Sequence, residues 1–344
     1  MLDQLGGSHT REQRTYTLLT PFKQGDLYLS TLKGGPGLGD PLQRPVEQIE
    51  ADIVGDHLLA RFAQSAYAVD DRDAARARRL ERSRPTSEWW AQERDRVLAR
   101  NLGEPVQVML AESMRLSPEW AAEFRGFWDL PPDFEFDVVC PTVPAARSEA
   151  GSITPAESAA AFLARSRAHP AVRFDDQDPS APIVPAETLA DLVDEKLSRR
   201  AVRDLQSGHK DPARFDTWVA LLQERVEWAD LIVLPLGERL YIVKRRNDGE
   251  YVIRTQAGVD LCGAEENWKM HAQIFVRDTD ATMQEIYPPL GYPDPAWQEL
   301  REFYCPVSGD LLEVDATPPG YPVVHDFLPD LVSFYEGWLG RPLP

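Results

Sequence analysis

A stretch rich in proline, alanine, serine and aspartate, residues 141–184, separates two parts of the chain that have stronger apolar patterns. It contains the runs PTVPAARSEAGSITPAES and DDQDPSAPIV. Such composition is typical of a linker, because it offers little apolar surface to bury. We therefore expect one region over 1–140, a linker over 141–184 with one short helix at Ala156–Ala168, and a second region over 185–344.

Charge and composition narrow the class of function. The 344 residues carry a formal net charge of −19, whereas a nucleic-acid surface needs clustered Lys and Arg. The chain has no long apolar run that would span a membrane, and its first residues lack the apolar core of a signal peptide. Its cysteines, Cys140, Cys262 and Cys305, are few and odd in number, as is typical of a reducing compartment. We expect a soluble, cytoplasmic protein that meets proteins or small molecules.

The first region is predicted to be mainly helical after short strands at YTLLT and Asp26–Leu32. The run GGPGLGDPL is interpreted as a tight turn, because no Gly-Lys-Ser/Thr follows it and Pro41 stands where a dinucleotide-binding helix would begin. Apolar spacing predicts one helix over 46–62, and an Ala- and Arg-rich run predicts a solvated helix over 70–84.

Two further helices have recognisable starts. Thr86 or Ser87 is expected to cap a helix over 88–100, and Ser117-Pro118-Glu119 begins another that runs to Trp128. The aromatic residues of the second helix share one face, which indicates packing and not a cofactor site. We expect four tryptophans of these helices to be exposed and to need a partner: Trp89, Trp90, Trp120 and Trp128.

The second region mixes helices with antiparallel strands, so the fold class is expected to be α+β: a helical N-terminal region, a linker, then helices plus a ribbon-like β domain. Amphipathic spacing predicts helices over 185–200 and 213–229. Further helices are expected over 280–287 and 329–339, and 268–278 is either strand or helix. Strands and hairpins are predicted at 231–237, 239–246, 250–256, 297–305 and 311–314, with a turn at Asn247-Asp248-Gly249.

The run Cys305-Pro306-Val307-Ser308-Gly309 has the form of a zinc-ribbon knuckle whose second cysteine is serine. A structural zinc site needs four thiolate or imidazole ligands. The hairpin over 253–263 adds only Cys262, and nothing in the spacing of His271 or His325 requires either to complete the set. The alternative is that both cysteines are small core residues, and we assign no metal ligand.

Other possible sites are incomplete. His325-Asp326 has the residue types for acid–base chemistry, but flanking prolines favour a structural turn. Asp278-Thr279-Asp280 suits a cation site or, more simply, a helix cap ahead of Ala281. No Gly-x-Ser-x-Gly, His-Glu-x-x-His or Cys/His pair is present. We therefore predict no catalytic and no cofactor-binding residue in this chain.

Four segments of the second region resemble one known family: 211–245, 267–288, 303–314 and 321–344. They read DPARFDTWVALLQERVEWADLIVLPLGERLYIVKR, NWKMHAQIFVRDTDATMQEIYP, FYCPVSGDLLEV and YPVVHDFLPDLVSFYEGWLGRPLP. In order and spacing they are similar to the acetone carboxylase gamma subunit family over residues 185–344. The segments 21–45, 87–101 and 117–128 resemble the C-terminal end of the hydantoinase B-type alpha subunit of ketone carboxylases, whose body is absent here.

The resemblance implies an accessory subunit of an ATP-dependent ketone carboxylase, which converts a ketone and bicarbonate into a 3-oxoacid. It implies hydantoinase A-like and hydantoinase B-like large subunits as partners, with ATP handled by the first and manganese held by the second. No cofactor is expected in this chain. Two alternatives stay open: a subunit of a hydantoinase- or oxoprolinase-type enzyme, and a stand-alone binding module.

The chain departs from the family at the zinc ribbon. The family's first knuckle has C-x-C-G and then another cysteine, and these positions are Thr255, Ala257-Gly258 and Cys262 here. Ser308 replaces a cysteine of the second knuckle. The joint loss implies a ribbon held by packing and hairpin hydrogen bonds, with an aromatic core drawn from Tyr251, Trp268, Phe303 and Tyr304.

Overall fold

The structure is a computed structural model that describes residues 39–101, 104–138, 183–194, 196–208, 211, 213–288 and 291–344. The chain forms two compact units, each of which joins segments far apart in the sequence. The first unit combines residues up to Trp89 with Lys269–Tyr321, and the second combines Trp90–Trp268 with Pro322–Pro344. The predicted strands before residue 39, the helix at Ala156–Ala168 and Cys140 lie outside the described residues. The division at 141–184 stays a prediction.

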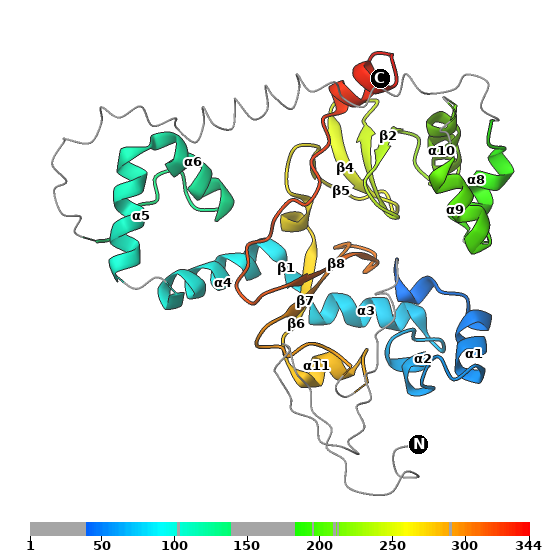
Figure 1. The fold of residues 1–344 in the computed structure, drawn as a ribbon, viewed down its shortest axis with the longest axis horizontal. Helices are drawn as coiled ribbons and strands as arrows, with labels where there is room; N and C mark the ends of the chain where they lie inside the picture. Colours follow the sequence, from blue (N-terminus) through cyan, green and yellow to red (C-terminus); the bar gives the residue numbers. More distant parts are fainter. Residues whose placement is uncertain are drawn as a thin grey trace, which may run out of the picture. The chain divides into compact units, whose positions relative to one another are not determined.

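The first unit is built on a four-stranded antiparallel sheet in the order β1-β6-β7-β8 (Figure 1). Its strands are β1 (Arg84–Pro85), β6 (Gln273–Arg277), β7 (Glu299–Tyr304) and β8 (Leu311–Thr317). Phe303 on the central strand β7 is fully buried and pairs with Ile274 of β6 on one side and Glu313 of β8 on the other. The predicted hairpin of β7 and β8 is therefore confirmed. The ambiguous run 268–278 forms a short 3-10 helix, η4 (Trp268–His271), followed by β6.

Short helices accompany this sheet: η2 (Pro41–Gln43), α1 (Val46–Val54), α2 (Arg61–Ser65), α3 (Arg72–Arg82) and α11 (Asp280–Gln284). The predicted continuous helix over 46–62 is wrong. Gly55 ends α1, and Asp56 has a φ of 57°, a left-handed conformation that no helix continues through. Gly39 also has a positive φ, 77°, which fits the turn expected at the glycine-rich run.

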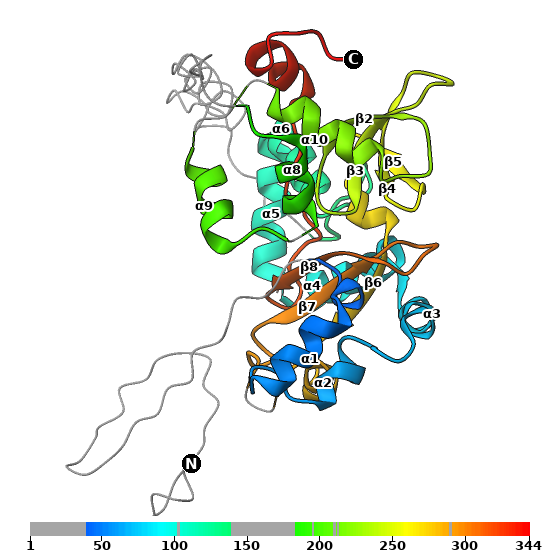
Figure 2. The ribbon, with the colours of Figure 1, turned by 90° about the vertical axis from the view of Figure 1, so that its right-hand side faces the viewer.

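The second unit contains a second four-stranded sheet, an antiparallel meander in sequence order. Its strands are β2 (Leu231–Pro235), β3 (Leu240–Lys244), β4 (Tyr251–Thr255) and β5 (Asp260–Gly263), close to their predicted positions. Gly249, with a φ of 79°, lies in the predicted turn between β3 and β4. Figure 2 shows α10 (Arg214–Gln223) beside β2. The core below this helix consists of Leu222, Ile232, Tyr241, Val243 and Val252.

Two predicted helices of this unit are shorter than expected. The helix over 185–200 is two helices, α8 (Ala186–Val193) and α9 (Arg199–Ser207), because Ser198 is extended and caps the second. The helix over 213–229 ends at Gln223, whose side-chain oxygen accepts a hydrogen bond from the Ile232 amide at 2.9 Å. The chain thus turns from α10 into the sheet several residues earlier than the apolar spacing suggests.

Three helices from the N-terminal region follow one another: α4 (Thr86–Asn101), α5 (Glu104–Leu116) and α6 (Pro118–Phe127). Ser117 caps α6 as predicted, accepting a hydrogen bond from the Trp120 amide at 3.2 Å. A π-helical segment, η5 (Ser333–Trp338), lies near the end of the chain, inside the stretch predicted to be helical. The α+β class is confirmed, and none of the described helices has the length and apolar character needed to cross a membrane.

The expectation of exposed tryptophans is wrong for Trp89 and Trp90, which are 5% and 1% exposed. The guanidinium of Arg301 lies over the Trp89 ring at 4.8 Å. Trp90 stacks on Trp128, which is half-buried like Trp120, at 6.2 Å between ring centroids. Because the Trp89 and Trp90 rings are buried by contacts inside the chain, they do not form an exposed surface for a partner.

Candidate functional site in two hairpin turns

The turn between β7 and β8 is closed by its own hydrogen bonds. The amide of the fully buried Cys305 donates to the Asp310 carbonyl at 2.9 Å, and the Gly309 amide donates to the Cys305 carbonyl at 3.0 Å. Ser308 donates its hydroxyl to the Asp310 carboxylate at 2.7 Å. The Ser308 side chain, at a position where the resemblance implies a second cysteine, is therefore hydrogen-bonded inside the turn.

A buried ion pair of the N-terminal region, between Asp40 and Arg79, also binds this turn. Arg79 on α3 donates two hydrogen bonds of 2.8 Å to the two carboxylate oxygens of Asp40, whose side chain is completely buried. The same guanidinium donates to the Gly309 carbonyl at 3.2 Å, and Asp40 accepts from the Leu311 amide at 3.0 Å. Bidentate Arg–carboxylate pairs are among the stronger hydrogen bonds in proteins, so they fix both partners.

The pKa of Asp40 reflects this environment. Burial by itself would raise the pKa, but hydrogen bonds and charge from Arg79, with the Leu311 and Leu42 amides, outweigh it and hold the pKa below its ordinary value. Burial likewise opposes the charge of Arg79, and Asp40 more than offsets it, so the pKa of Arg79 is raised. Both groups are charged at neutral pH.

Helix α3 makes two more contacts with the β6–β8 sheet. Arg76 donates through Nε to Asp310 at 3.0 Å, and the Arg82 guanidinium lies 4.2 Å from the centre of the Phe275 ring. We call Asp40, Arg76 and Arg79 the arginine cluster. The prediction of a simply solvated helix over 70–84 is wrong, because arginines along α3 bind the sheet.

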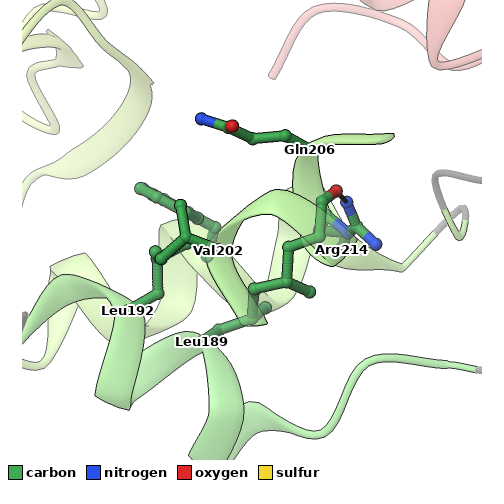
Figure 3. Close-up of a pocket in the computed structure, with 7 residues that line it drawn as sticks. Leu189, Leu192, Val202, Gln206 and Arg214 are labelled. Carbon is green, nitrogen blue, oxygen red and sulfur yellow. Dashed lines mark hydrogen bonds between the residues drawn. The ribbon is translucent and has the colours of Figure 1, made fainter. Parts of the chain in front are cut away.

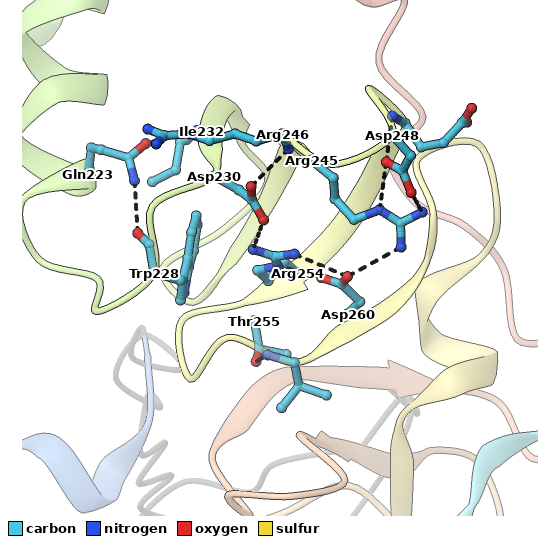
Figure 4. A network of polar contacts seen from close by, with 12 residues as sticks. Gln223, Trp228, Asp230, Ile232, Arg245, Arg246, Asp248, Arg254, Thr255 and Asp260 are labelled. Atoms are coloured by element: carbon cyan, nitrogen blue, oxygen red, sulfur yellow. Dashed lines mark hydrogen bonds and ion pairs between the residues drawn. The ribbon is translucent and has the colours of Figure 1, made fainter.

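The turn between β4 and β5 is held by a different network, drawn in Figure 4. Arg254 donates to Asp230 at 2.8 Å and to Asp260 at 3.1 Å, and its guanidinium lies 5.0 Å from the centre of the Trp228 ring. Thr255, at a position where the resemblance implies a cysteine, accepts a hydrogen bond from the Val259 amide at 3.2 Å. Ion pairs, an aromatic ring and a hydroxyl thus hold this turn.

The residues at these turns do not fit the zinc that the resemblance implies. A structural zinc site needs four thiolate or imidazole ligands, and each turn offers a single cysteine, Cys262 or Cys305. Burial raises the pKa of the Cys262 thiol to about 12, with the Glu266 charge contributing. Cys262 lies on β5 and Cys305 follows β7, in different sheets and units. Among the described side chains, neither cysteine belongs to a group of three or more potential metal ligands. We derive no metal role for them.

The four aromatic residues expected to form one replacement core are divided between the units. Phe303 and Tyr304 are buried in the first unit, while Trp268 is buried and Tyr251 half-buried in the second. Each turn therefore rests on its own packing.

The structure tests one of the two remaining candidate sites, the helix cap, and leaves the acid–base pair open. Thr279 caps α11 with a reciprocal bond to Thr282, and Asp280 accepts from the Tyr292 hydroxyl at 2.9 Å, so the helix-cap interpretation of Asp278-Thr279-Asp280 is confirmed. His271 is exposed in the first unit. In the second unit His325 is half-buried and Asp326 exposed; an acid–base role for this pair stays untested.

Sequence reasoning missed a buried lysine. Lys269 is fully buried, and its ammonium lies 2.8 Å and 2.9 Å from the Asp315 oxygens and 3.1 Å from Glu313. The two acids alternate along β8 and so share one face of the strand, where both reach the Lys269 ammonium. This group of charges is satisfied internally.

A cavity of about 200 Å³ lies among α8, α9 and α10 in the second unit (Figure 3). Its lining is mostly apolar, with two polar side chains at Gln206 and Arg214. Ligand sites usually exceed about 300 Å³, so this cavity is small for a substrate site. The lining residues are Leu189, Leu192, Val202, Leu205, Gln206, Arg214 and Trp218.

Comparisons with known proteins agree with the resemblance. The family model described as acetone carboxylase gamma subunit matches residues 226–339. The acetone carboxylase gamma subunit of Xanthobacter autotrophicus is 47% identical over 156 residues, which is 45% of this chain and 93% of that relative. The acetone carboxylase alpha subunit of the same organism is 38% identical over 139 residues, 35% of this chain but only 18% of that relative. The chain therefore belongs to the acetone carboxylase gamma subunit family.

Proposed function

We propose that this chain is an accessory, non-catalytic subunit of an ATP-dependent ketone carboxylase of the acetone or acetophenone type. The observation that carries the proposal is the match to a gamma subunit over 93% of that relative's length at 47% identity. Such an enzyme joins a ketone to bicarbonate and forms a 3-oxoacid. The nucleotide chemistry belongs to a hydantoinase A-like partner, and manganese belongs to a hydantoinase B-like partner.

The described charged groups support an accessory role. Arg79, Arg254 and Lys269 are bound to carboxylates that hold turns and strands. The Cys262 thiol, with a pKa raised to about 12 by burial, is a poor nucleophile at neutral pH. General acid–base catalysis needs a group that exchanges protons near neutral pH, whereas the pKa values of Arg79 and Arg254 are raised further by their carboxylate partners.

A surface near the C-terminus suits docking on the large subunits. Phe327 and Leu328 are 57% and 56% exposed, and Val332 and Trp338 are also exposed. Exposed apolar residues that cluster in one short stretch of chain are typical of interaction sites. We propose that this stretch contacts the large subunits of the carboxylase.

The test is purification from the source cells under mild conditions, through an affinity tag on this chain, followed by native mass spectrometry. We expect large chains of the hydantoinase A and B types to co-purify. The complex should then consume acetone or acetophenone with bicarbonate and ATP, and lose this activity when the tagged chain is withdrawn.

Three outcomes would overturn the proposal. Carboxylation of a ketone by the isolated chain would make it an enzyme and not an accessory subunit. Turnover of 5-oxoproline or a hydantoin without turnover of ketones would assign the complex to the related amide-hydrolysing class. A monodisperse monomer that captures no large chain would leave a stand-alone binding module.

A further inference from the structure

We infer that the cavity among α8, α9 and α10 binds a small neutral ketone in preference to a carboxylic acid of the same size. The choice of a ketone rests on the proposed function and deepens it, whereas the size, lining and charge of the cavity come from the structure alone. The ketone is bound at this site and is not transformed there.

Each of the three helices contributes apolar side chains to the cavity. Leu189 and Leu192 are three residues apart on α8, and Val202 and Leu205 are three apart on α9, so each pair lies on one side of its helix. Trp218 of α10 completes the apolar wall and packs against the core of the β2–β5 sheet. No residue of α9 is fully buried, as expected for a helix whose apolar side borders a cavity.

The volume limits the ligand to a small molecule. An apolar cavity of about 150 Å³ binds benzene, so a cavity of about 200 Å³ admits a ligand of roughly six to nine non-hydrogen atoms. Larger ligands occupy pockets above about 300 Å³. The mostly apolar lining disfavours molecules with many hydroxyl groups, because those groups would lose their hydrogen bonds with water. Short aliphatic ketones and phenyl ketones satisfy both limits.

The cavity also offers hydrogen-bond donors. Gln206 and Arg214 belong to its lining, and both side chains carry N–H groups (Figure 3). The guanidinium of Arg214 binds a carbonyl oxygen in the structure, since it donates to the Leu205 carbonyl at 3.2 Å. A ketone oxygen is an acceptor of the same kind. The lining therefore matches a ligand with an apolar body and one carbonyl oxygen.

The charges beside the cavity favour a neutral ligand over an acid. Arg214 forms an ion pair with Asp211, with 3.5 Å between Nε and the carboxylate, and the Asp211 side chain is only 1% exposed. The same carboxylate accepts a hydrogen bond from the Val184 amide at 3.3 Å, which fixes it beside the guanidinium. Because Asp211 balances the charge of Arg214, an anionic ligand would lose its water and meet a buried negative charge. A 3-oxoacid product should therefore bind less tightly than its ketone precursor.

Acetophenone and benzoate test the ligand class, because they have equal numbers of non-hydrogen atoms and differ in a methyl group against a charged oxygen. Each is titrated into the full chain, and binding is measured by saturation-transfer NMR. We expect acetophenone to bind about tenfold or more tighter than benzoate. Equal affinity for the two probes, or no binding of acetophenone up to its solubility limit, would overturn the inference.

Two tryptophan substitutions on α9 test the location. Val202→Trp places a large ring in the space among the three helices and should weaken acetophenone binding about tenfold or more. Ser207→Trp adds the same ring at an exposed position and should leave the binding unchanged. Equal affinity of the two variants for acetophenone would place the ligand elsewhere and overturn the assignment.

Asp211→Asn tests the charge balance and keeps the shape of the side chain. Without the negative charge the guanidinium of Arg214 can pair with an anion, so benzoate binding should strengthen about tenfold while acetophenone binding changes little. A merely structural role of Asp211 would weaken the binding of both probes. That result, or an unchanged ratio of the two affinities, would contradict the charge argument.

The outcomes separate this site from the proposed function. A carboxylase complex in which this chain binds no acetophenone would keep the proposed function and remove the site. Acetophenone binding by a chain that captures no large subunit would keep the site and remove the role in a carboxylase.

Discussion

Trp228 and Gly258 lie in contact across the β4–β5 turn: a Cβ on Gly258 would lie 3.0 Å from Cδ1 of the indole ring. Gly258 has a φ of 85°, in the region that side chains rarely adopt. The indole nitrogen of Trp228 donates to the Gln256 carbonyl at 3.2 Å, so the ring closes over the turn. The position needs glycine for two independent reasons.

Gly258→Ala should lower the free energy of unfolding by about 1–3 kcal/mol, because it adds backbone strain and a steric contact with the ring. Gly237→Ala is the matched control, since a Cβ there meets nothing within 4 Å and its φ is not positive. Urea denaturation followed by tryptophan fluorescence measures both. Equal stability of the two variants would contradict the described turn.

Loss of either partner of the Asp40–Arg79 pair should destabilise the first unit by about 3–5 kcal/mol, because the other charge stays buried without compensation. Asp40→Ala and Arg79→Ala should therefore lower the melting temperature, while Arg78→Ala changes it little. The double variant Asp40→Leu/Arg79→Met should be more stable than either single one. Calorimetry of the three single variants and the double variant measures these changes. If the double variant loses as much stability as the two single losses added together, Asp40 and Arg79 act independently.

The lowered pKa of Asp40 predicts acid sensitivity. A carboxyl group whose folded pKa lies below its unfolded value stabilises the fold fully above the ordinary value of 3.8, and this contribution is lost as pH falls through the folded pKa. Asp40→Asn removes that dependence. Unfolding free energies between pH 5 and pH 2 should fall less steeply for Asp40→Asn than for the wild type, and parallel curves would exclude a role for Asp40.

Chelators should leave the fold unchanged, because the turns are held by ion pairs and hydroxyl hydrogen bonds. We expect the same melting temperature with and without EDTA, and zinc well below one ion per chain by elemental analysis. Ser308→Ala removes the hydroxyl that donates to the Asp310 carboxylate and accepts from the Asp310 amide, and should cost about 1 kcal/mol. Stoichiometric zinc, or unfolding by EDTA, would show that the cysteines bind metal after all.

Lys269, with its partners Glu313 and Asp315, forms a second buried group of charges that can be tested by substitution. Lys269→Ala should destabilise the first unit by about 3–5 kcal/mol, since Asp315 would lose the cation that it binds through both oxygens. Lys196→Ala is the control, because Lys196 is exposed and pairs with Asp194 at the surface. A similar thermal midpoint for both variants would contradict this ion pair.

Features set by neighbouring residues were predictable from the sequence. The cap at Thr279, the start of α6 at Ser117 and the turn at Gly249 follow from hydrogen bonds and backbone preferences a few residues long. The strands β2, β3, β4, β7 and β8 carry enough β-branched and aromatic residues to be located within a few positions, whereas β1 was missed and β6 was left open between strand and helix. Helix lengths were less predictable, because apolar spacing continues across the breaks at Asp56 and Ser198.

The arginine cluster was not predictable, because Arg79 and Gly309 are 230 residues apart. Arg72, Arg76 and Arg79 recur at a spacing of four and then three, which places them on one face of a helix. That pattern indicates an acidic or carbonyl-rich partner surface, but not which one. The burial of Trp89 and Trp90 has the same cause, since it depends on residues that only the tertiary fold brings near.

The bond from the Leu311 amide to Asp40 spans 271 residues, and this separation has a consequence for protein synthesis. Ribosomes add about 5–20 residues per second, so roughly 15 to 55 s pass between the appearance of Asp40 and that of its partner strand. Throughout this time Asp40 and Arg79 lack the β7–β8 turn that they bind in the folded chain. The first unit is thus completed only after synthesis has passed Tyr321, and a ribosome that stops before that point releases a product without it.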